Sequence, residues 1–287
     1  MFAVVAGTGY TGRRVLEKLP ADASLGLGRT PIDTDRRFEI VDFDAPGALS
    51  VTLPDPCTVL YTCPPDGERD DRLQRFLAAL PHSPNRIVYI STTGVYGDCA
   101  GAVVTEDTPV NADNRLSRPR VAAEELLTLW AEKHACDLVI LRVPGIYGPG
   151  RLGVARLKSG EAWLEEADAN PGNRIHVDDL ADCCIAALAK DTPPGIYNVG
   201  DGDYRTATWF AGEVARQAGL PAPRTISREA AAREFSPLRL AFLSASRRVD
   251  ARRMRETLGV TPRTPEQGIR DSLAAQEGLP GPGFTGS

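Results

Sequence analysis

The sequence lacks any excess of positive charge and any long apolar run. Its 33 Lys and Arg residues are outnumbered by 38 Asp and Glu residues, which gives a formal net charge of -5. Nucleic acid is therefore not expected as a partner, because binding it requires clustered positive charge. No apolar stretch approaches the roughly 20 residues of a membrane-spanning helix, so no membrane association is expected either.

Histidine and cysteine are also scarce, and their spacing does not match the usual zinc motifs. The chain has three histidines and six cysteines, and it contains no Cys-x-x-Cys pair. Cys183 and Cys184 are adjacent, and two adjacent cysteines cannot easily share one zinc ion, so we expect no metal site. No signal-like segment precedes Phe2. We therefore expect a cytoplasmic protein with reduced, mostly buried thiols.

The first half of the chain alternates short apolar runs with helical patterns. The apolar runs predict strands at 2–6, 24–28, 38–43, 58–62, 86–90 and 138–142. Apolar residues at helical spacing predict helices at 13–19, 66–80 and 121–133. Strands that alternate with helices are typical of a parallel sheet covered on both faces. We therefore predict an α/β fold, with a doubly wound parallel Rossmann sheet as the domain of residues 1–143.

The pattern becomes less regular after Pro144, where Gly and Pro are frequent. Helical spacing predicts helices at 177–189, 207–218 and 250–258, and a short apolar run predicts a strand at 195–199. We expect residues 144–277 to form a smaller α/β substrate lobe, with segments near 174–200 returning to the Rossmann sheet. Residues 278–287 are rich in Gly and Pro and are expected to be a disordered tail.

A glycine-rich segment, Gly7-Thr8-Gly9-Tyr10-Thr11-Gly12, lies between the first predicted strand and the first predicted helix. In a dinucleotide-binding turn the first glycine permits the tight turn, and the second lets a pyrophosphate approach the backbone. The third lets the helix pack closely on the strand, and the helix N-terminus attracts the phosphates. We predict that all six residues contact a dinucleotide cofactor. A purely structural turn with incidental glycines is the alternative.

The end of the second predicted strand indicates which dinucleotide is bound. An NAD enzyme usually has Asp or Glu there to bind the ribose 2′-hydroxyl, whereas this chain has Gly28-Arg29-Thr30. A guanidinium can bind a 2′-phosphate through charge-assisted hydrogen bonds, and a carboxylate would repel it. Asp33 and Asp35 come later, in a predicted loop. We therefore predict NADP, held at Arg29 and Thr30, with NAD as the alternative.

Four more motifs follow in order along the chain. They are Ile-Ser-Thr-Thr-Gly-Val-Tyr-Gly at 90–97, Leu-Arg-Val-Pro-Gly-Ile-Tyr-Gly-Pro-Gly at 141–150, Asn-Arg-Ile-His-Val-Asp-Asp-Leu at 173–180 and Gly-Ile-Tyr-Asn-Val-Gly at 195–200. With the glycine turn they resemble the extended short-chain dehydrogenase/reductase family, which includes nucleotide-sugar epimerases and dehydratases. The resemblance extends from residue 2 to about residue 270. Further predicted cofactor contacts, from the ends of strands, are Asp42, Cys63, Pro64 and Pro144.

The same resemblance exposes a difference in the active site. The family uses a Ser or Thr, a Tyr that exchanges the proton, and a Lys four residues after the Tyr. Thr92 matches the hydroxyl position, but Leu116 and Arg120 occupy the Tyr and Lys positions. Leucine cannot exchange a proton, and arginine stays protonated. The chain thus resembles the atypical members of the family, and its catalytic candidates are Thr92, Arg120 and Tyr96.

Other residues near these motifs favour structural roles. Tyr96 is the best placed substitute for the missing tyrosine, although packing beneath the cofactor is the more ordinary role for it. Tyr147 lies in the loop that would flank the nicotinamide and has the same two interpretations. His176 titrates near neutrality in water, but its motif favours docking of the helix that follows.

Three functions remain open from the sequence. An NADP-dependent oxidoreductase of the atypical short-chain class, acting on a small or sugar-like substrate, is favoured by the complete cofactor motif and the second lobe. A non-catalytic NAD(P)-binding sensor or regulator is favoured by Leu116 and Arg120. A nucleotide-sugar epimerase-like enzyme would need acid/base groups on two sides of its substrate. A homodimer through the helices at 66–80 and 121–133 is neither supported nor excluded by their surface residues.

Overall fold

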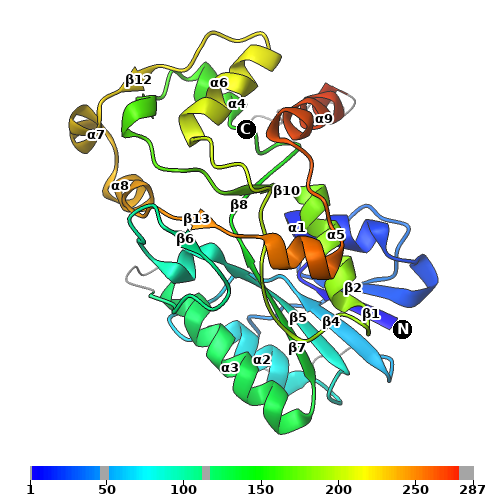
Figure 1. Ribbon diagram of the computed structural model, residues 1–287. Coiled ribbons are helices and arrows are strands. Elements are labelled where there is room, and N and C mark those ends of the chain that lie inside the picture. The colour runs from blue at the N-terminus through cyan, green and yellow to red at the C-terminus, as the bar shows by residue number, and fades with distance from the viewer. Residues whose placement is uncertain (1, 46–51, 112–116, 278–287) are drawn as a thin grey trace.

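The computed structural model describes residues 2–45, 52–111 and 117–277 (Figure 1). Its centre is a seven-stranded sheet in the order β11-β7-β5-β4-β1-β2-β3, and every neighbouring pair is parallel. The strands are β1 (Phe2–Ala6), β2 (Ser24–Gly28), β3 (Phe38–Ile40), β4 (Cys57–Tyr61), β5 (Arg86–Thr92), β7 (Asp137–Val143) and β11 (Gly195–Asn198). The predicted doubly wound α/β fold is confirmed.

Both faces of this sheet are buried, as the continuous apolar runs of its strands require. In β1, Ala3 and Val5 face one core, and Val4 and Ala6 face the other, because successive side chains alternate across a strand. Helices α1 (Tyr10–Lys18) and α5 (Val177–Leu188) cover the first face. Helices α2 (Asp71–Ala79) and α3 (Arg118–His134) cover the second, as Figure 1 shows.

Four predicted boundaries in the sheet and its covering helices differ from the structure by three residues or more, and one of them is the start of α3, at Arg118 rather than at residue 121. The first helix begins at Tyr10, so the last glycine of the turn lies inside it. The third strand ends at Ile40, three residues before the predicted end. The second helix begins at Asp71 rather than at residue 66, because the carboxylate of Asp70 accepts the N–H of Leu73 and caps the helix there.

The remaining elements gather above the carboxyl edge of the sheet in Figure 1. They are η2 (Thr93–Tyr96), β6 (Val103–Val104), β8 (Gly145–Tyr147), α4 (Val154–Lys158), β9 (Trp163–Leu164), η3 (Glu166–Asp168), β10 (Arg174–His176), α6 (Ala207–Gln217), β12 (Thr225–Ile226), α7 (Arg228–Glu234), α8 (Pro237–Ser244), β13 (Arg248–Val249) and α9 (Pro265–Glu277). The helix predicted at 250–258 is a shorter π-helical turn, η4 (Met254–Leu258).

The division into a domain of residues 1–143 and a lobe of residues 144–277 stays a proposal, and the predicted tail at 278–287 lies outside the described residues. All six cysteines are free thiols, and five of them are buried. In the parts of the chain that the structure describes, no helix is both long and apolar enough to cross a membrane.

Candidate functional site

The glycine-rich turn brings β1, α1 and the end of β4 into close contact. Gly7 has a φ angle of +99°, and a Cβ atom there would lie 2.7 Å from the Oγ1 of Thr62. A Cβ atom on Gly12 would lie 1.9 Å from the carbonyl oxygen of Gly7. Only glycine fits these two positions. Gly7 has a positive φ angle that other residues rarely adopt, and a side chain on Gly12 would clash with backbone. Both glycines are therefore required by the fold itself.

Gly9 differs from these two glycines, because a Cβ atom on it would meet no atom within 4 Å. It is the N-cap residue of α1 and has no side chain to satisfy the first N–H groups of that helix. The first turn also carries no acidic residue. The helix end thus keeps free donors and a partial positive charge next to open space, which is what a pyrophosphate group requires.

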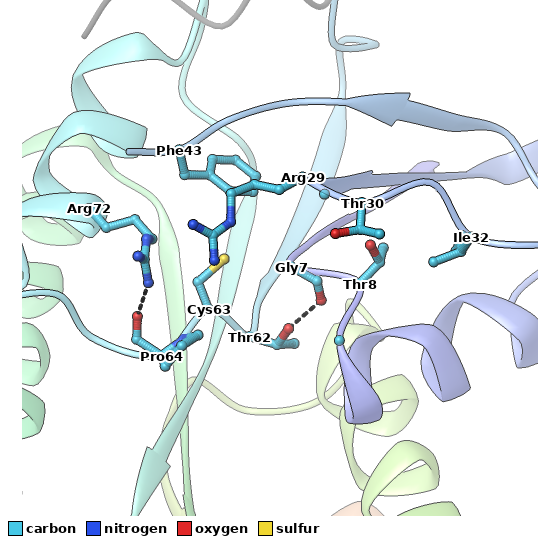
Figure 2. Close-up of a pocket in the computed structure, with 12 residues that line it drawn as sticks. Gly7, Thr8, Arg29, Thr30, Ile32, Phe43, Thr62, Cys63, Pro64 and Arg72 are labelled. Carbon is cyan, nitrogen blue, oxygen red and sulfur yellow. Dashed lines mark hydrogen bonds between the residues drawn. The ribbon is translucent and has the colours of Figure 1, made fainter. Parts of the chain in front are cut away.

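A pocket of about 260 Å³ lies next to this turn (Figure 2). The predicted cofactor residues that line it are Gly7, Thr8, Gly9, Arg29, Thr30, Cys63 and Pro64. The lining residues that the sequence did not suggest as contacts are Gly28, Ile32, Phe43, Thr62 and Arg72. The ends of β1, β2 and β4 therefore converge on one cavity, as expected for the carboxyl edge of a parallel sheet.

The other predicted cofactor residues do not line this pocket. Thr11 and Gly12 are buried within α1. The hydroxyl of Tyr10 donates to the carbonyl of Pro149, and Pro144 lies at the end of β7.

Asp42 is not among the residues that line this pocket, and its contact with the cofactor stays a prediction. Its side chain is exposed, and its carboxylate accepts the N–H of Asp44 at 3.0 Å. The early end of β3 lets the chain turn at this point, so Phe43 is the residue that lines the pocket.

Arg29 does not lie alone at the end of β2. Its guanidinium is 2.7 Å from the carboxylate of Asp44, which also accepts two hydrogen bonds from Arg72 at 2.6 and 2.9 Å. Arg75 lies 3.7 Å from Asp44 and 3.3 Å from Asp66. The hydrogen bond from Arg72 is the main reason that the pKa of Asp44 is lowered. With the carboxylate of Asp42, which accepts the N–H of Asp44, three guanidiniums and three carboxylates lie at this end of the pocket.

Arg72 also connects helix α2 to the loop after β4. Its NH1 group donates to the carbonyl of Pro64 at 2.7 Å, as Figure 2 shows. Only 12% of its side chain is exposed, and with its bonds to Asp44 it holds two walls of the pocket together. The sequence could not indicate this role, because Arg72 is 28 positions from Asp44 and the two meet only in the folded chain.

The structure brings two of the catalytic candidates to the same strand end. Thr92 is the last residue of β5, and its hydroxyl oxygen accepts the N–H of Gly94. Arg120, in the first turn of α3, donates to the hydroxyl of Tyr89 at 3.0 Å and to the carbonyl of Ile90 at 2.8 Å. Arg120 therefore lies against β5 just before Thr92. Leu116, the residue at the tyrosine position, lies outside the described residues.

The hydroxyl of the third candidate, Tyr96, is bound by two other side chains. Its side chain is 1% exposed, and its hydroxyl donates to the side-chain oxygen of Asn198 at 2.6 Å. The same hydroxyl accepts a hydrogen bond from Arg142 at 3.0 Å. Burial raises the pKa of Tyr96. This geometry favours a structural role, and catalysis by Tyr96 stays a prediction.

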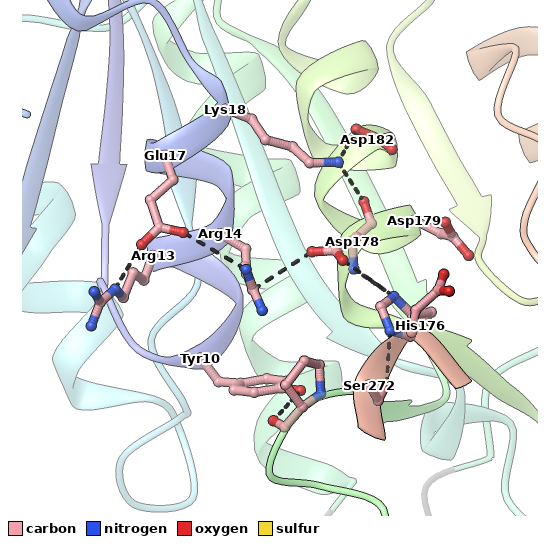
Figure 3. Close-up of polar contacts among 12 residues, drawn as sticks. Tyr10, Arg13, Arg14, Glu17, Lys18, His176, Asp178, Asp179, Asp182 and Ser272 are labelled. Carbon is pink, nitrogen blue, oxygen red and sulfur yellow. Dashed lines mark hydrogen bonds and ion pairs between the residues drawn. The ribbon is translucent and has the colours of Figure 1, made fainter. Parts of the chain in front are cut away.

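Tyr147 and His176 also make structural contacts. The ring of Tyr147 is buried between those of His176 and Phe210, at centroid distances of 5.2 and 5.1 Å. Nδ1 of His176 accepts the N–H of Asp178 and so caps α5, while Nε2 lies 3.1 Å from the hydroxyl of Ser272 (Figure 3). Burial lowers the pKa of His176 and favours its neutral form. The helix-docking role predicted for His176 agrees with this geometry.

Near these residues, Asp201 is a buried carboxylate with an unusual environment. One oxygen accepts the N–H of Asp203 at 2.9 Å, and the other is buried without a hydrogen-bond partner among the described residues. Burial raises the pKa of Asp201 to about 7, from an ordinary value near 4. The protonated carboxyl of Asp201 therefore contributes fully to the stability of the fold below about pH 4, and this contribution is lost as the pH rises towards 7.

Asp201→Asn is expected to be more stable than the wild type at pH 8, by on the order of 2 kcal/mol, with the difference fading towards pH 4. Asparagine keeps the oxygen that accepts from Asp203 but never ionises. Urea unfolding at both pH values measures this difference. Asp203→Asn is the matched control. Burial raises the pKa of Asp203, but hydrogen bonds from Arg205 outweigh burial and lower it, so removing this carboxylate should destabilise the protein at pH 8. An Asp201→Asn protein that is less stable than the wild type at pH 8 would contradict the prediction.

Comparison with known proteins agrees with this architecture. A model of the NAD dependent epimerase/dehydratase family matches residues 73–200. Protein YeeZ of Escherichia coli strain K12 is 30% identical over 194 residues, which are 67% of this chain and 65%, just under two thirds, of YeeZ. dTDP-6-deoxy-L-talose 4-dehydrogenase (NAD(P)(+)) of Kitasatospora kifunensis is 28% identical over 225 residues, which are 73% of this chain and 68% of that protein.

A solved structure extends the similarity to nearly the whole chain. A functionally unknown conserved protein from Silicibacter pomeroyi is 27% identical, with a TM-score of 0.78. The match covers 96% of this chain and 99% of that one. The chain thus resembles the NAD dependent epimerase/dehydratase family over residues 73–200, and its parallel sheet with a glycine turn at the carboxyl edge is the fold expected of that family.

Proposed function

We propose that this protein is an NADP-dependent oxidoreductase that acts on a small molecule without the usual tyrosine acid. The observation that carries this proposal is the position of Arg29, which lines the same pocket as Gly7 and Gly9. The end of β2 thus presents a guanidinium where an NAD enzyme presents a carboxylate. The relative from Kitasatospora kifunensis, which is named for the use of NAD(P)+, supports the redox class.

The residues present suit a dinucleotide phosphate. The N-terminus of α1 and the open side of Gly9 would hold the pyrophosphate. Arg29 and Thr30 would hold the 2′-phosphate, with Arg72 as a second cation on the wall of the same pocket. When bound, the cofactor supplies a hydride donor or acceptor. Phe43 and Ile32 would provide an apolar wall for the adenosine half of the cofactor.

At the other end of the sheet edge, the chain offers Thr92 and Arg120 to a substrate. The hydroxyl of Thr92 can donate to a substrate oxygen while its own oxygen accepts from Gly94. Arg120 stays protonated, so it can stabilise negative charge but cannot exchange a proton. We therefore infer a reaction in which the proton, if one is needed, comes from water or from the substrate itself.

Arg29→Gln is expected to weaken NADPH binding by about tenfold or more and to leave NADH binding within about twofold. The reason is that a lost charge-assisted contact costs about 1.5–3 kcal/mol, and only NADPH has the 2′-phosphate. Calorimetric titration with each cofactor measures both constants. Arg233→Gln is the matched control, because Arg233 is 76% exposed and pairs with Glu229 on α7. Equal weakening of both cofactors by Arg29→Gln would remove Arg29 as the 2′-phosphate ligand.

A non-catalytic NADP-binding sensor is the second candidate, and the bonding of Arg120 favours it. Arg120 is held by Tyr89 and Ile90, and a leucine stands in the tyrosine position of the sequence. Stopped-flow absorbance of bound NADPH at 340 nm, with a panel of carbonyl compounds, separates the two functions. Oxidation of NADPH by any of them supports the enzyme. Tight binding with no oxidation by the whole panel supports the sensor.

A further inference from the structure

A second pocket, of about 540 Å³, lies in the C-terminal part of the chain and is larger than the pocket at the glycine turn. Leu164 of β9 and Phe235, which follows α7, give it an apolar wall, and they are only 5% and 7% exposed. Trp163 also lines it, and the indole Nε1 is buried without a hydrogen-bond partner among the described residues. This pocket therefore combines an apolar wall with an unused donor.

Two arginines border the pocket, and both stack on its aromatic rings. The guanidinium carbon of Arg156 lies 4.4 Å from the ring centre of Trp163, and that of Arg239 lies 3.5 Å from the ring centre of Phe235. Stacking of this kind leaves the edge of a guanidinium available for hydrogen bonds. Part of each edge is already used, because the NH2 group of Arg239 donates to the carbonyl of Ala162 and Nε of Arg156 donates to Glu161. The two cations are therefore held in place before any ligand binds.

The carboxylate of Glu161 lies close to both cations. One of its oxygens lies 3.1 Å from Arg156 and 3.7 Å from Arg239. Burial and the like charge of Arg156 lower the pKa of Arg239. Glu234 also acts on Arg239 and is itself paired with Arg224, so three guanidiniums and two carboxylates leave one positive charge unbalanced. A ligand with one negative charge would balance it.

The same region is poorly suited to a diphosphate. Two phosphates would bring at least two negative charges against one unbalanced positive charge. The N-terminus of α6, whose Ala207 and Thr208 line the pocket, is not free for an anion. The side chain of Thr206 accepts the N–H of Trp209 there and donates to the carboxylate of Glu166 at 2.7 Å. An acidic group thus already lies at that helix end and would repel phosphate.

We propose that this pocket binds a planar, aromatic or conjugated acid with a single carboxylate. The ring would lie on the apolar wall and the carboxylate on Arg156 and Arg239. This inference goes beyond the proposed function, because no described residue lines both this pocket and the pocket at the glycine turn.

The test compares three probes by calorimetric titration of the full chain: 4-hydroxycinnamate, its neutral amide, and UDP. We expect 4-hydroxycinnamate to bind at least tenfold more tightly than the amide, because only the acid can pair with the guanidiniums. We expect UDP to bind more weakly than the acid. Binding of UDP more tightly than the acid, equal binding of acid and amide, or no binding of the acid would each overturn the proposal.

Variants then locate the site. The double variant Arg156→Gln/Arg239→Gln should lose at least tenfold in affinity for 4-hydroxycinnamate. Arg216→Gln is the matched control, since Arg216 lies on the exposed side of α6 and pairs with Glu213. Unchanged affinity in the double variant would overturn the assignment to this pocket. NADPH titration of the same samples separates the two proposals: loss of acid binding alone concerns this pocket, and failure to bind NADPH alone concerns the cofactor site.

Discussion

Gly9→Val is expected to abolish the binding of both NADPH and NADH while the protein remains folded. The Cβ atom of Gly9 would meet no protein atom within 4 Å, so the fold has room for a larger side chain there. That room is the space next to the N-terminus of α1 in which a pyrophosphate would lie. Filling it should raise both dissociation constants by at least about a hundredfold, which is ~2.7 kcal/mol. Calorimetric titration and a thermal melt of the same sample measure binding and folding together.

Two comparisons make this result specific. Gly212→Val in α6 also places its side chain in open space, and it should leave binding of both cofactors unchanged. Gly12 would be a poor choice, because its Cβ atom would clash with the backbone oxygen of Gly7 and lost folding would then explain lost binding. A folded Gly9→Val protein that still binds NADPH would show that the glycine turn serves the fold alone.

The layered fold was predictable because burial on both sides of a parallel sheet leaves a strong local signal. The runs at 2–6 and 24–28 are short, apolar and followed by turn residues, and both are strands with the predicted boundaries. The end of the third strand was less predictable, because its residues 39 and 40 are exposed at the edge of the sheet. Apolar residues at this edge of the sheet therefore do not indicate a buried strand.

The residues around the cofactor pocket were predictable only where they follow directly from the strands. Gly7, Arg29 and Cys63 stand at strand ends, so their convergence follows from the topology. The pairing of Arg72 with Asp44 does not, because the two residues are 28 positions apart and meet only through the path of a loop. Long-range ion pairs of this kind leave no periodic signal in a sequence.

Tyr96 shows the same limit for catalytic residues. Its position just after Thr92 suggested a substitute acid, and its sequence neighbours gave no sign of Arg142 and Asn198, which bind its hydroxyl from other strands. A residue's chemistry can be inferred from its type, but its availability depends on partners that the fold brings from elsewhere. With the hydroxyl of Tyr96 bound by these partners, the end of β5 offers Thr92 and Arg120 to a ligand.

Arg142→Leu is expected to destabilise the protein by about 3–5 kcal/mol, because it leaves a buried carboxylate without its partner. Arg142 and Glu124 are 4% and 6% exposed, and two hydrogen bonds of 3.2 and 2.7 Å join them. Ser91 also donates to this carboxylate, and Tyr96 would lose the donor to its hydroxyl. Urea unfolding at pH 7, followed by circular dichroism, measures the free energy of unfolding.

The comparison with other variants separates the cost of an unpaired charge from the value of the pair. Adding Glu124→Leu to Arg142→Leu should restore part of the lost stability, since no buried charge then remains unpaired. The exposed pair of Arg233 and Glu229 gives the reference, and Arg233→Leu should cost less than about 1 kcal/mol. If Arg142→Leu costs no more than this reference, the pair does not hold the end of β5. A large loss would mean that the strand end carrying Thr92 depends on a buried network that also binds the hydroxyl of Tyr96.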